Sequence, residues 1–229
     1  MTKIALNVLR DRPEIFKSFQ GEGRNAGQEC VFIRLKGCNL YCSWCDTKDS
    51  WDATNPLNEG TVRLGVPELV GRINSFECKH LVITGGEPLL QQPALRVLLD
   101  ELEDFYVEIE TNGTIMPSLN IAQWNVSPKL YHSGVDQLHR SNPRAMQAFR
   151  EMDNADFKFV IGRPEHASEL VGLINHYRIP AERVFLMPLG QTRVQLAENE
   201  EFVKKFCSVY GFNFSDRLHI KKYGNRRGV

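Results

Sequence analysis

Six short apolar segments, separated by amphipathic stretches, most constrain the fold of this chain. They are rich in β-branched and aromatic residues, and they predict strands over 31–35, 80–84, 105–109, 123–126, 157–161 and 183–187. Apolar residues at helical spacing predict helices over 67–76, 93–102, 142–152, 166–177 and 198–210. A strand–helix order that recurs in this way predicts an α/β fold with a parallel sheet covered by helices.

The number of β/α units favours one of two architectures. Six units fall short of the eight that close a complete TIM barrel, so the sequence predicts a partial, TIM-like (β/α)6 barrel. A doubly wound sheet is the alternative. The chain of 229 residues suits one sizeable domain, and no repeat or linker divides it, so we expect residues 1–229 to form a single domain.

Polar and glycine-rich segments come directly after the predicted strands. They are residues 37–38, 84–88, 110–113, 127–129 and 187–188. In parallel β/α folds the loops at the carboxyl ends of the strands converge on one mouth, which carries the active site. The pattern therefore predicts a site assembled from the whole domain.

Charge and hydropathy argue against nucleic-acid and membrane partners. Lys plus Arg equals Asp plus Glu, 28 each, so no overall field recruits nucleic acid or an anionic membrane. No apolar run reaches the length needed to cross a bilayer, and the N-terminus lacks the pattern of a signal peptide. Three of the six cysteines are clustered, whereas the cysteines of small secreted domains are spread along the chain and paired in disulfide bonds. The clustering favours metal binding and a cytoplasmic location.

That cluster is Cys38, Cys42 and Cys45, with the spacing C-x3-C-x2-C. Three thiolates on one tight loop can hold three irons of a 4Fe–4S cluster and leave the fourth iron without a protein ligand. The alternative is a zinc-stabilised binding module without catalysis, which wants four ligands. Candidates for the fourth zinc ligand are Cys30, Cys78, His80 and His132, none of which stands in a second paired motif.

The cysteine motif, with Trp44 just before its last cysteine, resembles that of the radical S-adenosylmethionine (SAM) superfamily. Residues 84–88, Thr-Gly-Gly-Glu-Pro, resemble the second motif of the superfamily, in which backbone groups receive the methionine amine. The resemblance implies that SAM chelates the open iron through its amino and carboxylate groups. One electron from the cluster would then cleave SAM to methionine and a 5′-deoxyadenosyl radical.

Further motifs resemble those of the 7-carboxy-7-deazaguanine synthase family. They are FKSFQGEG at 16–23, Cys-Asp-Thr at 45–47, Ser-Pro-Lys at 127–129 and YGNRRGV at 223–229. The resemblance implies conversion of 6-carboxy-5,6,7,8-tetrahydropterin to 7-carboxy-7-deazaguanine with release of ammonia, in the pathway to queuosine and other 7-deazapurines. It also implies Mg²⁺, a homodimer and an electron donor of the flavodoxin or ferredoxin type. Another radical SAM enzyme, such as a glycyl-radical activase, is the nearest rival, and residues 20–23 and 46–47 argue against it.

The resemblance also assigns candidate site residues. Thr47 would offer its hydroxyl to Mg²⁺, a hard cation that prefers oxygen. Residues expected to contact the substrate are Phe19, Gln20, Gly21, Arg34, Thr84 and Val229. Residues expected to contact SAM are Trp44, Asp46, Gly86, Ser127, Pro128, Lys129, Met187, Pro188, Leu189 and Gly190.

Several of these residues also have an ordinary structural interpretation. Arg34 suits a substrate carboxylate, yet an arginine on a strand often forms an ion pair instead. Thr47 could bond its own backbone at a turn, and Trp44 could pack in the core. Glu87 and Glu110 face the same mouth and receive no role from the sequence.

Overall fold

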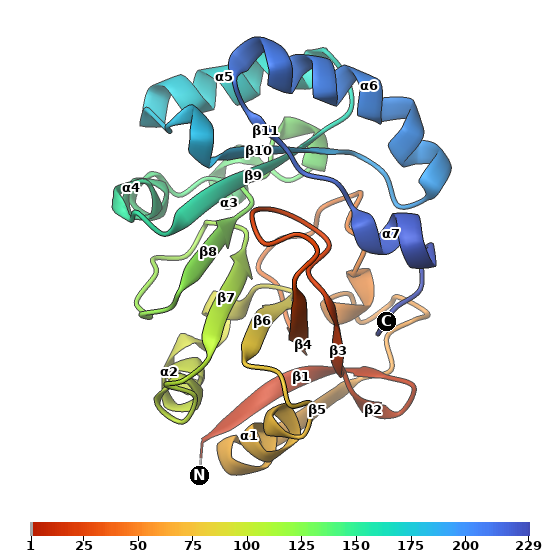
Figure 1. Ribbon diagram of the computed structural model, residues 1–229, viewed down its shortest axis with the longest axis vertical. Coiled ribbons are helices and arrows are strands. Elements are labelled where there is room, and N and C mark those ends of the chain that lie inside the picture. The colour runs from red at the N-terminus through yellow and green to blue at the C-terminus, as the bar shows by residue number, and fades with distance from the viewer. Residues whose placement is uncertain (1) are drawn as a thin grey trace.

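The computed structural model describes residues 2–229, in which eleven strands form one sheet. The strands are β1 (Lys3–Leu9), β2 (Arg12–Pro13), β3 (Ile15–Phe19), β4 (Glu29–Leu35), β5 (Thr61–Gly65), β6 (His80–Gly85), β7 (Tyr106–Thr111), β8 (Gln123–Val126), β9 (Ala155–Ile161), β10 (Val184–Pro188) and β11 (Asn213–Phe214). Figure 1 shows the sheet curving from β1 at one end of the molecule to β10 and β11 at the other.

The parallel part of the sheet runs in the order β4-β6-β7-β8-β9-β10-β11. The six predicted strands are confirmed as β4 and β6 to β10. Their order never reverses, as the order of a doubly wound sheet would, and the sheet does not close on itself. The fold is therefore a partial barrel.

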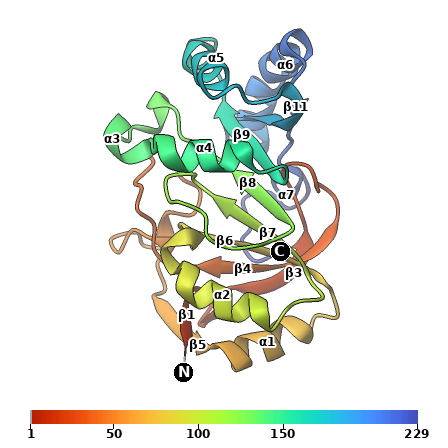
Figure 2. The same ribbon diagram turned by 90° about the vertical axis from the view of Figure 1, so that its left-hand side faces the viewer.

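Helices cover the outer face of this curved sheet (Figure 2). These helices are α1 (Val66–Asn74), α2 (Gln92–Asp100), α4 (Pro143–Glu151), α5 (Glu165–Tyr177) and α6 (Arg193–Tyr210). The chain also contains two short helices, α3 (Gln137–Arg140) and α7 (Leu218–Tyr223). Four short 3-10 turns complete the set: η1 (Lys48–Ser50), η2 (Pro88–Gln91), η3 (Tyr131–Ser133) and η4 (Ala181–Arg183).

Most element boundaries differ from the prediction by one or two residues, and two of the differences have a clear local cause. Helix α6 begins at Arg193 rather than at 198, because the Thr192 side chain accepts a hydrogen bond from the Gln195 amide and caps the helix there. Strand β10 begins at Val184, because Arg183 belongs to η4. No helix lies between β7 and β8 in the described chain.

An antiparallel extension that the sequence did not predict precedes the barrel. Strand β3 pairs antiparallel with β4, and β1 pairs antiparallel with β4, β2 and β5. The turn from β3 to β4 carries residues 20–28 into the concave side of the sheet, where Asn25 donates to Glu108 at 2.8 Å and Arg24 to Asp156 at 2.7 Å. This turn places Gln20 and Glu22 inside the barrel.

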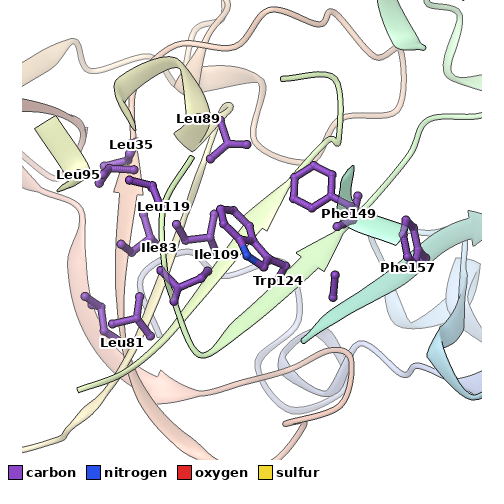
Figure 3. Close-up of a cluster of buried hydrophobic side chains, with 14 of the residues drawn as sticks. Leu35, Leu81, Ile83, Leu89, Leu95, Ile109, Leu119, Trp124, Phe149 and Phe157 are labelled. Atoms are coloured by element: carbon purple, nitrogen blue, oxygen red, sulfur yellow. The ribbon is translucent and has the colours of Figure 1, made fainter. Parts of the chain in front are cut away.

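Strand alternation separates an apolar face from a polar one. On β7 and β8 the residues Val107, Ile109 and Trp124 belong to the continuous hydrophobic core beneath the helices, shown in part in Figure 3. Full burial of each such side chain stabilises the fold by about 1.5–3 kcal/mol. Their neighbours Glu108 and Asn125 are buried on the concave side instead, where Asn125 donates to Glu108 at 2.6 Å. The functional side chains therefore face the inside of the barrel.

Among the helices of residues 2–229, none has the length and apolar character that a membrane crossing requires.

Candidate active site

A cavity of about 610 Å³ opens at the carboxyl ends of the parallel strands. Its walls include every residue to which the sequence analysis gave a role except Pro128 and Pro188. Residues from β3, β4, β6 and β7, the cysteine loop, the β10–α6 loop and the C-terminus thus meet at one place, as the loop pattern predicted.

The three cysteines form a small apolar cluster of their own in the wall of this cavity. Cys42 is buried with Leu40 and Val135, and Cys38 and Cys45 pack against them. Burial raises the pKa of the Cys38 thiol to about 11, so metal binding there must displace a proton.

Two N–H groups donate hydrogen bonds to sulfur atoms of this cluster. The Leu40 amide donates to Cys38 Sγ at 3.4 Å, and the Trp51 indole Nε1 donates to Cys45 Sγ at 3.3 Å. Such bonds suit the thiolates of an iron–sulfur site. Within residues 2–229, no three or more His, Cys, Asp or Glu side chains are gathered where a single metal ion could sit. Three thiols from one loop, two of them accepting hydrogen bonds, are a donor set that fits an iron–sulfur cluster.

The Gly-Gly-Glu turn after β6 lies directly against the start of the cysteine loop. A Cβ atom on Gly86 would lie 1.9 Å from the Gly37 oxygen, so only glycine allows this approach. The Glu87 amide donates to the Gly37 carbonyl at 2.8 Å, while its carboxylate accepts from the Thr111 hydroxyl and the Asn112 amide at 2.8 and 2.7 Å. Glu87, fully buried, therefore joins the loops after β4, β6 and β7.

Polar side chains from β6, β7 and the β3–β4 turn line another part of the cavity, called the substrate end below. The Thr84 hydroxyl donates to Glu110 Oε2 at 2.8 Å, and Gln20 Nε2 donates to Glu110 Oε1 at 3.3 Å. Arg34, at the same end, pairs through Nε with Glu14 Oε1 at 2.9 Å. Among the described residues its two Nη groups make no hydrogen bond, so they are available to a ligand in the cavity.

Arg217 is a central residue of the site that the sequence analysis missed. Its guanidinium donates to Glu22 Oε1 at 3.0 Å and to the Gly190 carbonyl at 2.7 Å, and it pairs with Asp46. Lys158 pairs with the second oxygen of Glu22. Arg217 follows a two-residue strand and precedes a short helix, so no periodicity marks it.

This network changes the interpretation of Asp46. The Asp46 carboxylate lines the cavity but pairs with Arg217. Burial raises the pKa of Asp46, and the Arg217 guanidinium outweighs that effect and holds the pKa below its usual range. The side chain is therefore an ionised anchor between the cysteine loop and Arg217.

The β10–α6 loop closes the cavity beside the cysteines. Gln191 Nε2 donates to the carbonyls of Trp44 and Cys45 at 3.1 and 3.2 Å, which fixes the cysteine loop to the segment 187–190. Across the cavity, Lys129 Nζ donates to Ser127 Oγ at 2.8 Å and lies 5.7 Å from the centre of the Trp44 ring. Gln191 is a second residue that the sequence analysis missed.

The Trp51 bond to Cys45 gives a prediction for the reduction potential. The substitution Trp51→Phe keeps the ring but removes the N–H donor, and the reduced cluster, which carries the larger negative charge, loses more stabilisation than the oxidised one. We expect a lower midpoint potential, measured by redox titration of the electron paramagnetic resonance signal. An unchanged potential would show that this hydrogen bond does not reach the cluster.

Comparisons with known proteins agree with this geometry. The family described as the radical SAM superfamily matches residues 32–178. The 7-carboxy-7-deazaguanine synthase of Pyrobaculum aerophilum is 37% identical, with 94% of this chain and 95% of the relative covered. The enzyme of the same name from Hyperthermus butylicus is 37% identical, with 94% of each covered.

A solved structure adds a match in three dimensions. The crystal structure of QueE from Escherichia coli superposes with a TM-score of 0.73 at 26% identity, and the match covers 95% of each chain. Identity over nearly the whole length, together with the cysteine loop and the Gly-Gly-Glu turn on one cavity, establishes the relationship. The chain belongs to the 7-carboxy-7-deazaguanine synthase family of the radical SAM superfamily.

Proposed function

We propose that this protein is a radical SAM lyase that converts 6-carboxy-5,6,7,8-tetrahydropterin to 7-carboxy-7-deazaguanine and releases ammonia, in 7-deazapurine and queuosine biosynthesis. The observation that carries the proposal is a single cavity whose walls combine three clustered cysteines with Gln20, Thr84 and Arg34. When bound, the cluster and SAM supply the reducing electron and the hydrogen-abstracting radical.

The chain's own residues divide the work between the two ends. Cys38, Cys42 and Cys45 would hold the iron–sulfur cluster. Gly86, Trp44, Asp46, the 127–129 loop and residues 187–190 would surround the space for SAM, and the ion pair with Arg217 would hold Asp46 in place there.

At the substrate end, polarity matches the pterin. The free Nη groups of Arg34 suit the carboxylate in a bidentate pair. Gln20, Thr84 and Glu110 offer donors and acceptors together, which the amide-like edge of the pterin needs. Phe19, Gly21 and Val229 line the same end.

Thr47 is the proposed protein ligand of Mg²⁺. Its hydroxyl makes no hydrogen bond to an oxygen or nitrogen among the described residues, and its nearest polar contact is Cys45 Sγ at 3.7 Å. The oxygen is therefore available to a hard cation that keeps most of its waters.

Removal of this hydroxyl tests the assignment. The variant Thr47→Ala should need about tenfold or more Mg²⁺ for half-maximal activity, since it loses one oxygen ligand. Thr47→Ser, which keeps the hydroxyl, is the matched control and should retain the dependence of the unaltered protein. A magnesium titration that is the same for Ala and Ser would remove Thr47 from the metal's ligands.

Three further features belong to the proposal. The chain acts as one radical SAM domain, because a single hydrophobic core extends from β1 to α6. A flavodoxin- or ferredoxin-type protein supplies the electron, and the protein forms a homodimer. The last two rest on the family relationship.

Enzymatic assay separates this activity from that of the rival class. The reduced, reconstituted protein is incubated anaerobically with carboxytetrahydropterin, SAM and Mg²⁺, and the deazapurine and ammonia are measured. We expect both products to appear together. Cofactor cleavage without deazapurine would leave a radical SAM enzyme of another specificity, such as a glycyl-radical activase.

A further inference from the structure

The C-terminal tail, residues 225–229, lies along the substrate end of the cavity on the open side of the barrel (Figure 1). It leaves α7 at Gly224 and passes close to β1, where a Cβ atom on Gly228 would lie 2.7 Å from Leu9. Within residues 2–229, the only hydrogen bonds and ion pairs of this tail are those of the Arg227 guanidinium. One side chain therefore fastens the segment.

Arg227 is fastened to two buried carboxylates. Its Nη2 lies 2.6 Å from Glu14 Oε2, and its Nη1 pairs with Asp49; the two acids are only 2% and 3% exposed. Asn7 Nδ2 donates to both carboxylates at 2.8 Å, which brings two like charges close together. A second cation, Lys36, lies close to this pair of acids and donates to Asn7 Oδ1 at 3.0 Å. Without Arg227, both acids would lose a partner that offsets their repulsion.

The two carboxylates are connected to different groups of the proposed site: Glu14 to Arg34, and Asp49 to the turn that follows Thr47. Glu14 Oε1 accepts from Arg34 Nε at 2.9 Å, and this bond directs the remaining nitrogens of Arg34 to the cavity. Asp49 belongs to η1, the turn that begins after Thr47 and is closed by the bond from the Ser50 amide to the Thr47 carbonyl at 2.9 Å.

We propose that Arg227 is a positioning residue that closes the substrate end of the cavity by joining the tail to Glu14, which orients Arg34, and to Asp49, which follows Thr47. When Arg227 holds the tail against the cavity, the same two ion pairs align Arg34 for the substrate carboxylate and the turn after Thr47 for Mg²⁺. The inference rests on the proposed function for its substrate, whereas the fastening of the tail does not.

The test compares three variants. Arg227→Met removes both ion pairs, and Arg227→Lys keeps the charge but replaces the two Nη groups by a single nitrogen on a shorter side chain. Arg226→Met removes the same charge from the neighbouring residue, which is exposed and makes no ion pair with a described residue. All three leave Gly228 and Val229 unchanged, so release of Val229 by a carboxypeptidase, followed by mass spectrometry, reports how firmly the tail is held.

We expect Arg227→Met to release Val229 about tenfold faster and to raise the KM for carboxytetrahydropterin about tenfold, more than it lowers kcat. Arg227→Lys should recover part of both changes, and Arg226→Met, the control for the fastening of the tail, should release Val229 at the rate of the unaltered protein. The change that SAM causes in the cluster's electron paramagnetic resonance signal should survive in every variant, since Arg227 pairs only with Glu14 and Asp49, neither of which is proposed to contact the cluster or SAM. Equal release of Val229 from the two methionine variants, or an unaltered KM in Arg227→Met, would overturn the inference. If the unaltered protein did not convert the pterin, the proposed function would fall, and the comparison of Val229 release would still decide whether Arg227 fastens the tail.

Discussion

Replacement of Cys42 by alanine is expected to abolish both cluster assembly and cofactor cleavage. Cys42 supplies the central one of three thiols that share a small cluster in the cavity wall, and two thiols cannot hold the three irons. Purified anaerobically, the variant should lose the brown colour and most of its iron and sulfide, and form no 5′-deoxyadenosine.

The fold should survive this change. The Cys42 cluster with Leu40 and Val135 is separate from the main core, so we expect a loss of about 1 kcal/mol in the free energy of unfolding. Cys78→Ala is the matched control, since Cys78 lies away from the cavity lining and should leave the iron content intact. Iron and sulfide contents equal to the control's would contradict the assignment of Cys42.

The second large effect is expected for Arg217→Met. This change leaves the buried carboxylate of Glu22 and the partly exposed one of Asp46 without their shared guanidinium, and loss of one partner from a buried ion pair such as Glu22–Arg217 typically costs about 3–5 kcal/mol. The same substitution at Arg72, an exposed residue paired with Glu68 on α1, should cost less than about 1 kcal/mol. Denaturant unfolding of both variants measures the difference, and equal stabilities would contradict the central place given to Arg217.

The deficit of Arg217→Met should also depend on pH. In the unaltered protein the Lys158 and Arg217 charges outweigh burial and hold the pKa of Glu22 below its usual range, and Arg217 does the same for Asp46. A lowered pKa stabilises the fold above the unfolded-state pKa, near 4–4.5, and that stabilisation is lost as the pH falls below it. In the variant both groups bind protons more readily, so its deficit should be largest near pH 7 and shrink toward pH 4.

The sequence predicted the parallel strands of the barrel but not the antiparallel strands β1, β2, β3 and β5 beside them. The six parallel strands are four to seven residues long, rich in β-branched and aromatic residues and bounded mostly by glycine, proline or asparagine, and that pattern sufficed. The N-terminal strands β1, β2, β3 and β5 pair antiparallel through contacts between distant segments, which periodicity in one window does not reveal.

The site shows the same division. Residues in dense local motifs, such as Cys38 and Gly86, could be placed from spacing and from the resemblance. Arg217, Gln191 and Glu14 are isolated residues whose roles come from partners far away in sequence, so no local pattern identifies them. Asp46 was correctly placed at the cavity, yet its partner could not be foreseen, because Arg217 lies 171 residues further on.

The most direct measurement is the amount of deazapurine formed when SAM is limiting. Reduced, reconstituted protein is given excess carboxytetrahydropterin and Mg²⁺ with SAM below the substrate concentration. Because conversion of carboxytetrahydropterin to the deazapurine and ammonia consumes no net electrons, the radical can return its hydrogen atom and SAM can be regenerated. We therefore predict that 7-carboxy-7-deazaguanine will accumulate beyond the amount of SAM supplied. Absence of deazapurine from a protein that carries its full cluster and cleaves SAM would contradict the proposed activity.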